Sequence, residues 1–96
     1  MTTFNNVEGV FEDWVSIYSI LGVSQGVALL LQNEGINWFI LKESVDKPPK
    51  ESLDGLSVTS LVYGNQSSKL ITEGSIDVWL RPRDYGKYLR IAVQEV

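Results

Sequence analysis

The 96-residue sequence predicts a mostly β protein: an antiparallel β-sandwich or small barrel of about six strands, with one short helix near the N-terminus. Three observations support this prediction. Short apolar segments alternate with turn-forming residues along the chain, the C-terminal segment alternates apolar and polar residues with the two-residue period of a strand, and one segment alone has helical spacing. A chain of this length usually forms one core, so residues 1–96 are expected to be a single domain.

The helical segment is "FEDWVSIYSILG", residues 11–22. Its apolar residues follow the i, i+3, i+4, i+7, i+10 spacing of a helical stripe. Glu12 and Asp13 suit a helix N-terminus, and Gly22 suits the position that ends a helix. The segment also contains good strand formers, so a strand is the alternative.

A first hairpin is predicted from two apolar runs, Val27–Gln32 and Ile36–Lys42, which flank a three-residue connection ending in Gly35. Both runs are apolar on both faces. Strands of this kind are usually covered on both sides, so we expect either a second layer of the domain or another subunit over them.

A polar loop, Ser44–Gly55, follows this hairpin and contains the Pro48-Pro49 pair. Loops of this length are at the upper end for a compact domain and are often functional. Strands are then predicted at Leu56–Tyr63 and at Leu70–Thr72, with the turn "GNQSSK" between them.

The last element is a predicted hairpin in "VWLRPRDYGKYLRIAV", residues 78–93. Pro82 lies at a strand end, where its missing N–H costs little, and Gly86 supplies the positive φ that the turn requires. The residues expected to share the inward face are Ile76, Val78, Leu80, Leu89, Ile91 and Val93.

The opposite face of this hairpin is predicted to carry Trp79, Arg81, Tyr88 and Arg90. Four interpretations are open. The face is an ordinary solvent face with cation–π contacts, it is buried under the helix or a second sheet, it binds a protein, or it is a platform for single-stranded nucleic acid. Trp, Tyr and Arg are the residues enriched at protein-binding hot spots.

Composition excludes several functional classes. The chain has no cysteine and no histidine, so the usual nucleophilic thiolate, general base and zinc ligands are missing. The glycines of "GVSQG" follow the predicted helix and precede a strand, which is the reverse of a phosphate loop. Acidic residues near Asp46 and Asp54 lack the alternation of a calcium loop, and Lys47 and Lys50 oppose a cation. We therefore expect a protein that is not an enzyme and uses no metal or cofactor.

Charge and hydropathy limit the expected partners. The formal net charge of −4 disfavours nucleic-acid binding, although Arg81, Arg83, Lys87 and Arg90 cluster near the C-terminus. No apolar run is long enough for a membrane helix, and the first residues do not form a signal peptide. We expect no nucleic-acid and no membrane partner.

The order of elements resembles that of small structural proteins of tailed bacteriophage particles. The similarity runs through "WVSIYSILGVSQGVALLLQNEGINWFILKES", a proline-containing loop and "VWLRPRDYGKYLRIAVQEV". The resemblance implies a virion β-domain, made in the host cytoplasm, that decorates a head, joins head and tail or belongs to the tail, commonly as a symmetric oligomer. It contains no functional motif, so it assigns no partner residue.

The resulting expectation is a non-enzymatic virion structural protein that binds other capsid or tail proteins. Trp79, Arg81, Tyr88 and Arg90 are the expected partner-binding residues. The loop is expected to add contacts through Asp46, Lys47, Lys50 and Asp54. Self-association is expected as well, because a symmetric assembly would bury Leu30, Phe39 or Leu41.

Two other functions are consistent with the sequence. A carbohydrate- or ligand-binding β-module would use Trp38, Trp79 and Tyr88 as stacking platforms. A phage regulatory or inhibitory protein would bind a host protein through the acidic surface.

Overall fold

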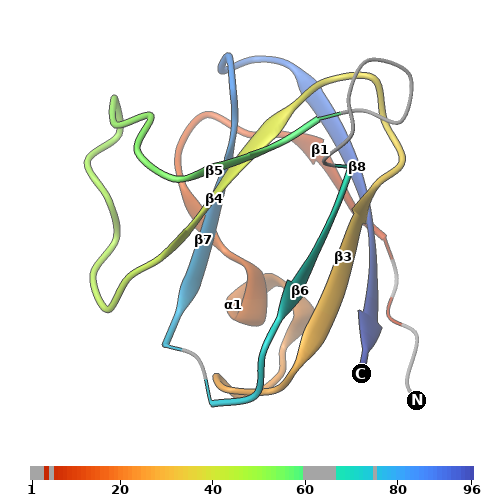
Figure 1. The fold of residues 1–96 in the computed structure, drawn as a ribbon. Helices are drawn as coiled ribbons and strands as arrows, with labels where there is room; N and C mark the ends of the chain where they lie inside the picture. Colours follow the sequence, from red (N-terminus) through yellow and green to blue (C-terminus); the bar gives the residue numbers. More distant parts are fainter. Residues whose placement is uncertain (1–3, 5, 60–66, 75) are drawn as a thin grey trace.

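Two four-stranded antiparallel sheets make up the described part of the protein (Figure 1). The computed structural model describes residues 4, 6–59, 67–74 and 76–96. The first sheet, here the β8 sheet, contains in spatial order β1 (Val7–Val10), β8 (Tyr88–Glu95), β3 (Leu29–Asn33) and β6 (Ser68–Ile71). The second, the β7 sheet, contains β2 (Val15–Ser16), β7 (Val78–Pro82), β4 (Phe39–Glu43) and β5 (Leu56–Val58).

The predicted class, mostly β with one short helix, is confirmed. The prediction of about six strands is too low, because the described part of the chain has eight, and their two sheets do not close into one barrel. The strand expected at Leu56–Tyr63 is β5. Residues 60–63 of that prediction and 64–66 of the following turn lie outside the described residues.

Neither predicted hairpin forms. β3 pairs with β8 and β6, whereas β4 pairs with β7 and β5. In the same way β7 and β8 belong to different sheets. Each of these connections carries the chain from one sheet to the other. An alternating pattern gives the buried face of a strand but not its neighbour, so two strands facing each other across a core have the same pattern as a hairpin.

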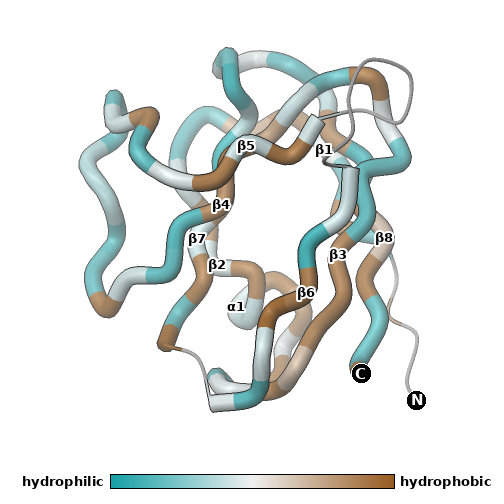
Figure 2. The backbone as a smooth tube through the Cα atoms, viewed as in Figure 1, coloured by the Kyte–Doolittle hydropathy of each residue, from teal (hydrophilic) through white to brown (hydrophobic). Residues whose placement is uncertain are grey.

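The core lies between the two sheets and is built from their inward side chains. Figure 2 shows hydrophobic stretches along β3 and β4. The inward alternation predicted near the C-terminus is confirmed for five of its six residues, whereas Ile76 is 42% exposed. The buried residues of the core cluster are Val7, Ile17, Tyr18, Leu29, Leu31, Phe39, Leu41, Val58, Ile71, Val78, Leu80, Leu89, Ile91 and Val93.

The two apolar faces of β4 are both covered within the chain. Phe39 and Leu41 belong to the core, while Ile40, which is paired with Arg81 across the sheet, points to the other side and is also buried. The covering layer is the 44–55 loop, which lies on the outer side of the β7 sheet (left in Figure 1). No second subunit is needed to bury Phe39 or Leu41.

The helix α1 (Ile17–Leu21) is shorter than predicted. Val15 and Ser16 pair with β7, so the chain is still a strand there, and the Ser16 side chain then caps the helix by accepting from the Ser19 N–H at 3.3 Å. The end is confirmed at Gly22, whose φ of 71° is left-handed and whose N–H donates to the Tyr18 carbonyl.

The close approach of the loop to β4 makes Gly55 a sensitive position. A Cβ there would lie 2.4 Å from the Leu41 carbonyl oxygen and 2.8 Å from Ile40 Cγ2, at a φ of +151°. We expect Gly55→Ala to lower the free energy of unfolding by about 3 kcal/mol, measured by urea denaturation with tryptophan fluorescence.

Gly9→Ala is the matched control, because Gly9 has a similar φ of +143° with nothing within 4 Å of the added Cβ. It should cost about 1–2 kcal/mol, which is the backbone strain alone. Equal losses in the two variants would show that the loop does not press against β4.

Candidate functional site

The four predicted contact residues do not share one face. Trp79 and Arg81 lie on β7, Tyr88 and Arg90 lie on β8, and the two strands are in different sheets. Both pairs point away from the common core, so they reach opposite sides of the molecule. The prediction that these four residues share one face is wrong, because β7 and β8 belong to different sheets and do not form the hairpin on which it was based.

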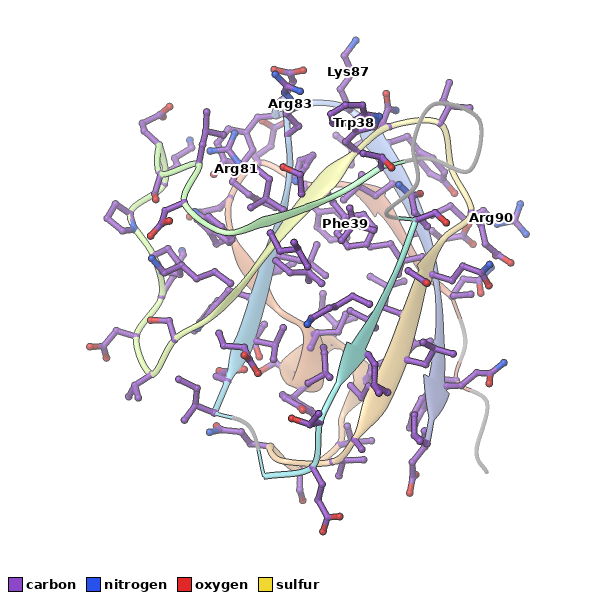
Figure 3. The ribbon with its side chains drawn as sticks, in the orientation of Figure 1. Trp38, Phe39, Arg81, Arg83, Lys87 and Arg90 are labelled. Atoms are coloured by element: carbon purple, nitrogen blue, oxygen red, sulfur yellow. The ribbon has the colours of Figure 1, made fainter. Side chains whose placement is uncertain are left out.

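Arg81, labelled in Figure 3, is not a surface residue, because it is only 4% exposed. Its guanidinium donates hydrogen bonds to backbone carbonyls. Its Nη1 donates to the Lys50 and Ser52 oxygens at 3.0 and 3.2 Å, Nε to Pro82 at 2.9 Å and Nη2 to Arg83 at 3.0 Å. A planar guanidinium can satisfy several acceptors at once, and these carbonyl dipoles stabilise its charge. Arg81 is therefore a structural residue.

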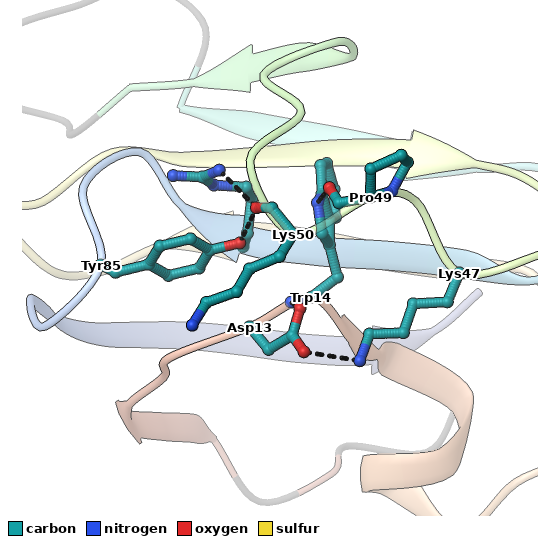
Figure 4. A network of polar contacts seen from close by, with 7 residues as sticks. Asp13, Trp14, Lys47, Pro49, Lys50 and Tyr85 are labelled. Atoms are coloured by element: carbon teal, nitrogen blue, oxygen red, sulfur yellow. Dashed lines mark hydrogen bonds and ion pairs between the residues drawn. The ribbon is translucent and has the colours of Figure 1, made fainter.

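Aromatic side chains hold the same loop at further points (Figure 4). The Trp14 indole N–H donates to the Pro49 oxygen at 3.0 Å, and the Tyr85 hydroxyl donates to the Lys50 oxygen. The Tyr85 ring also lies 3.9 Å from the Arg81 guanidinium, and desolvation raises the pKa of its hydroxyl. The 44–55 loop is thus fixed through its own carbonyl groups.

Three of the four predicted loop contacts have partners inside the chain. Lys47 Nζ lies 2.6 Å from an Asp13 carboxylate oxygen, and Lys42 Nζ lies 2.6 Å from Asp54. The Lys50 ammonium lies 5.7 Å from the centre of the Tyr85 ring. Asp46 is exposed.

These ion pairs lower the pKa of the Asp13 and Asp54 carboxyl groups. The hydrogen bond from Lys47 is the largest cause that lowers the pKa of Asp13, and the hydrogen bond from Lys42 lowers the pKa of Asp54. Both carboxylates are partly or largely exposed, so solvent weakens each pair.

Tyr88 and Arg90 form a polar surface on the outer side of the β8 sheet. The Tyr88 hydroxyl donates to a Glu8 carboxylate oxygen at 2.7 Å, and this bond is the main cause that raises the pKa of Tyr88. Arg90 Nε lies 3.9 Å from Glu8 and 3.7 Å from Glu34. Both side chains stay accessible, with Tyr88 50% exposed.

A shallow groove brings two of the predicted residues together. Trp79 is half-buried, and its indole N–H donates to the Ser44 oxygen at 3.0 Å, which fixes the ring. The groove, here called the tryptophan groove, has a volume of about 390 Å³ and a mainly apolar lining. Its lining residues are Trp14, Val15, Ser16, Ser19, Ile20, Lys47 and Trp79.

A second concavity of about 520 Å³, here called the loop-end hollow, lies where the β3–β4 and β7–β8 connections meet. Figure 3 shows Trp38, Arg83 and Lys87 gathered at this end of the molecule. The lining residues are Ile36, Asn37, Trp38, Arg83, Asp84 and Lys87.

The sequence reasoning did not assign Arg83 and Lys87 to a site. The signal that could have found them was the cluster of positive charge near the C-terminus of an acidic chain. Trp38 was named as a stacking platform together with Trp79 and Tyr88, but Trp38 lines the loop-end hollow and Trp79 lines the tryptophan groove, so the three do not form one ligand surface.

Comparison with known protein families, with curated protein sequences and with solved structures gives no match to this chain. Among the residues that the structure describes, no three acidic side chains gather as metal ligands would, and no helix is long and apolar enough to span a membrane.

Loss of the Arg81 guanidinium should destabilise the fold. Arg81→Ala removes the guanidinium from four carbonyl groups, of which only the Lys50 oxygen keeps another side-chain donor among the described residues, the Tyr85 hydroxyl. We expect a loss of about 3 kcal/mol in the free energy of unfolding. Arg81→Lys should recover little of it, because an ammonium lacks the planar set of donors.

Arg90→Ala is the matched control, since Arg90 is exposed and its carboxylate partners are distant; it should cost less than about 1 kcal/mol. Urea denaturation of the three variants measures these differences. Similar losses for Arg81→Ala and Arg90→Ala would contradict the structural role.

The Asp13–Lys47 pair predicts a pH effect. A carboxylate with a lowered folded-state pKa contributes stability above its unfolded pKa, and this contribution is lost as the pH falls through the folded pKa. Lys47→Gln removes the largest cause of the lowered Asp13 pKa, while the hydrogen bond from the Trp14 N–H remains. The variant should therefore lose less stability than the wild type between pH 7 and strongly acidic pH.

The free energies of unfolding of Lys47→Gln and of a control, Lys69→Gln, are compared by urea denaturation at a series of pH values. Lys69 has no carboxylate within 4.0 Å in the described part of the chain, so that variant should keep the wild-type acid dependence. An unchanged acid dependence in Lys47→Gln would mean that the pair contributes nothing.

Proposed function

We propose that this protein is a non-enzymatic binding module, an accessory β-sandwich domain that contacts another protein through the tryptophan groove. The observation that carries the proposal is the fixed, half-buried indole of Trp79 beside an exposed Ile20, with the buried Trp14 in the same lining. Aromatic side chains held in position lose little conformational entropy on binding, and tryptophan is enriched at interaction hot spots.

The chemistry of the groove favours an apolar side chain of the partner as the contact. The Trp79 indole N–H donates to the Ser44 carbonyl, which leaves apolar ring surface of Trp79 to line the groove. Trp14, whose indole N–H donates to the Pro49 carbonyl, is only 2% exposed and supports the groove from within. Ile20 is 43% exposed at its edge. The charge of Lys47 is already paired with Asp13.

The biological setting that we propose is the virion of a tailed bacteriophage, in capsid decoration, head–tail joining or the tail. The support is the resemblance in the order of the elements, together with a groove suited to a neighbouring protein. Self-association is part of this proposal: Leu30 and Leu70 are cross-strand partners at one edge of the β8 sheet, and Leu70 is 49% exposed.

The proposal is tested in purified particles of the phage that encodes the chain. Quantitative mass spectrometry should detect the protein at a fixed copy number. In complementation, Ile20→Asp should lower its particle occupancy, because a charge at the groove is expected to weaken the contact by about 1–3 kcal/mol, roughly tenfold or more.

Val10→Asp provides the control, as Val10 is 55% exposed but lies on the other sheet. It should load like the wild type, and both variants should keep the wild-type urea midpoint. Absence of the protein from particles would refute the virion setting, whereas normal loading of Ile20→Asp would refute the groove as the contact.

A further inference from the structure

The loop-end hollow has the features of a second binding site, separate from the tryptophan groove. Its two loops are joined by a backbone hydrogen bond and by a bond from a side-chain amide to the backbone. The Arg83 N–H donates to the Trp38 oxygen at 3.0 Å, and the Asn37 side-chain amide donates to the Tyr88 oxygen at 2.9 Å. The backbone of the two loops is therefore held in place before any ligand arrives, which lowers the cost of binding.

The hollow carries positive charge that the chain does not neutralise. In the described residues, Arg83 and Lys87 have no carboxylate oxygen within 4.0 Å of their nitrogens, whereas Lys42, Lys47 and Arg90 do. Lys50, Lys69 and Arg81 also have no described carboxylate that close, but they do not line the hollow, whereas Arg83 and Lys87 meet at one concavity. Two cations without a described carboxylate partner, against the single carboxylate of Asp84, leave the lining with a net positive charge that favours an anionic ligand.

The Trp38 side chain restricts which kind of anionic ligand fits the hollow. The Arg83 guanidinium lies 5.2 Å from the centre of the Trp38 ring, so charge and indole belong to one surface. A ligand that uses both must carry an anionic group next to an apolar face. The volume of about 520 Å³ is in the usual range for small-molecule sites.

Two further polar groups select for hydroxyl donors on the same ligand. Asp84 offers carboxylate oxygens, and Asn37 offers its amide oxygen because its amide nitrogen donates to Tyr88. An acidic peptide offers these acceptors only its backbone N–H groups, whereas a sugar acid carries several hydroxyl donors beside its carboxylate.

We infer that the loop-end hollow binds an acidic sugar, with Arg83 and Lys87 on its carboxylate, Trp38 under its apolar C–H face and Asp84 and Asn37 on its hydroxyls. The inference does not depend on the protein partner proposed above, since the groove and the hollow share no residue.

The test is a titration of the ¹⁵N-labelled full chain, followed by NMR, with galacturonate, glucuronate and N-acetylneuraminate as probes. At least one acidic sugar should shift the Trp38 indole signal, assigned with Trp38→Phe, and leave that of Trp79 unchanged. Arg83→Gln should weaken this binding roughly tenfold or more, because it removes a charge-assisted hydrogen bond.

Matched controls separate this site from less specific binding. Lys69→Gln removes one positive charge outside the hollow and should keep the wild-type affinity. Galactose and glucose, which lack the carboxylate, should bind at least tenfold more weakly. Asp84→Asn should weaken the acidic sugar without creating affinity for galactose.

Four results would overturn the inference. They are no binding of any acidic sugar, equal affinity for inorganic phosphate, tighter binding of a tetraglutamate peptide, and wild-type affinity in Arg83→Gln. Equal phosphate binding would indicate an anion site only, and tighter peptide binding would indicate an acidic protein segment. Particle occupancy of Ile20→Asp would change in none of these cases.

Discussion

The buried guanidinium of Arg81 is the constraint on which the rest of the structure depends. A cation that is 4% exposed needs acceptors, and Arg81 obtains them from four backbone carbonyls. Two belong to the 44–55 loop and two to the end of β7 and the connection after it. One side chain therefore joins the covering layer to the sheet beneath it, which lets Ile40 be buried without a second subunit.

The tryptophan groove and the loop-end hollow both depend on this connection between the loop and the sheet. The loop that Arg81 holds supplies the carbonyls that fix Trp14 and Trp79, so the groove has its shape only while the loop is in place. The bond from Arg81 to the Arg83 carbonyl holds the backbone of a residue that lines the hollow. The groove presents apolar ring surface and the hollow presents charge, so the two surfaces suit chemically different partners.

Part of the candidate site was visible in the sequence. Trp79 and Lys47 were identified as contact residues, and they meet in the groove. Arg81 was assigned to the surface because alternation places it on the outward side of β7, and a local pattern contains no information about a loop that folds back over that side. Arg83 and Lys87 stood out as charge, but their position beside Trp38 arises from two connections that are distant in sequence.

The sequence by itself determined the β class, the inward residues of most strands, the helix end at Gly22 and the positive φ at Gly86. These features follow from local sterics and from the two-residue period of a strand. Only the tertiary structure decided which strands are neighbours, because a strand pattern is the same for a hairpin as for two strands facing across a core. It also decided that the polar loop is a structural layer, since the donors that hold its carbonyls, at Trp14, Trp79, Arg81 and Tyr85, come from distant parts of the chain.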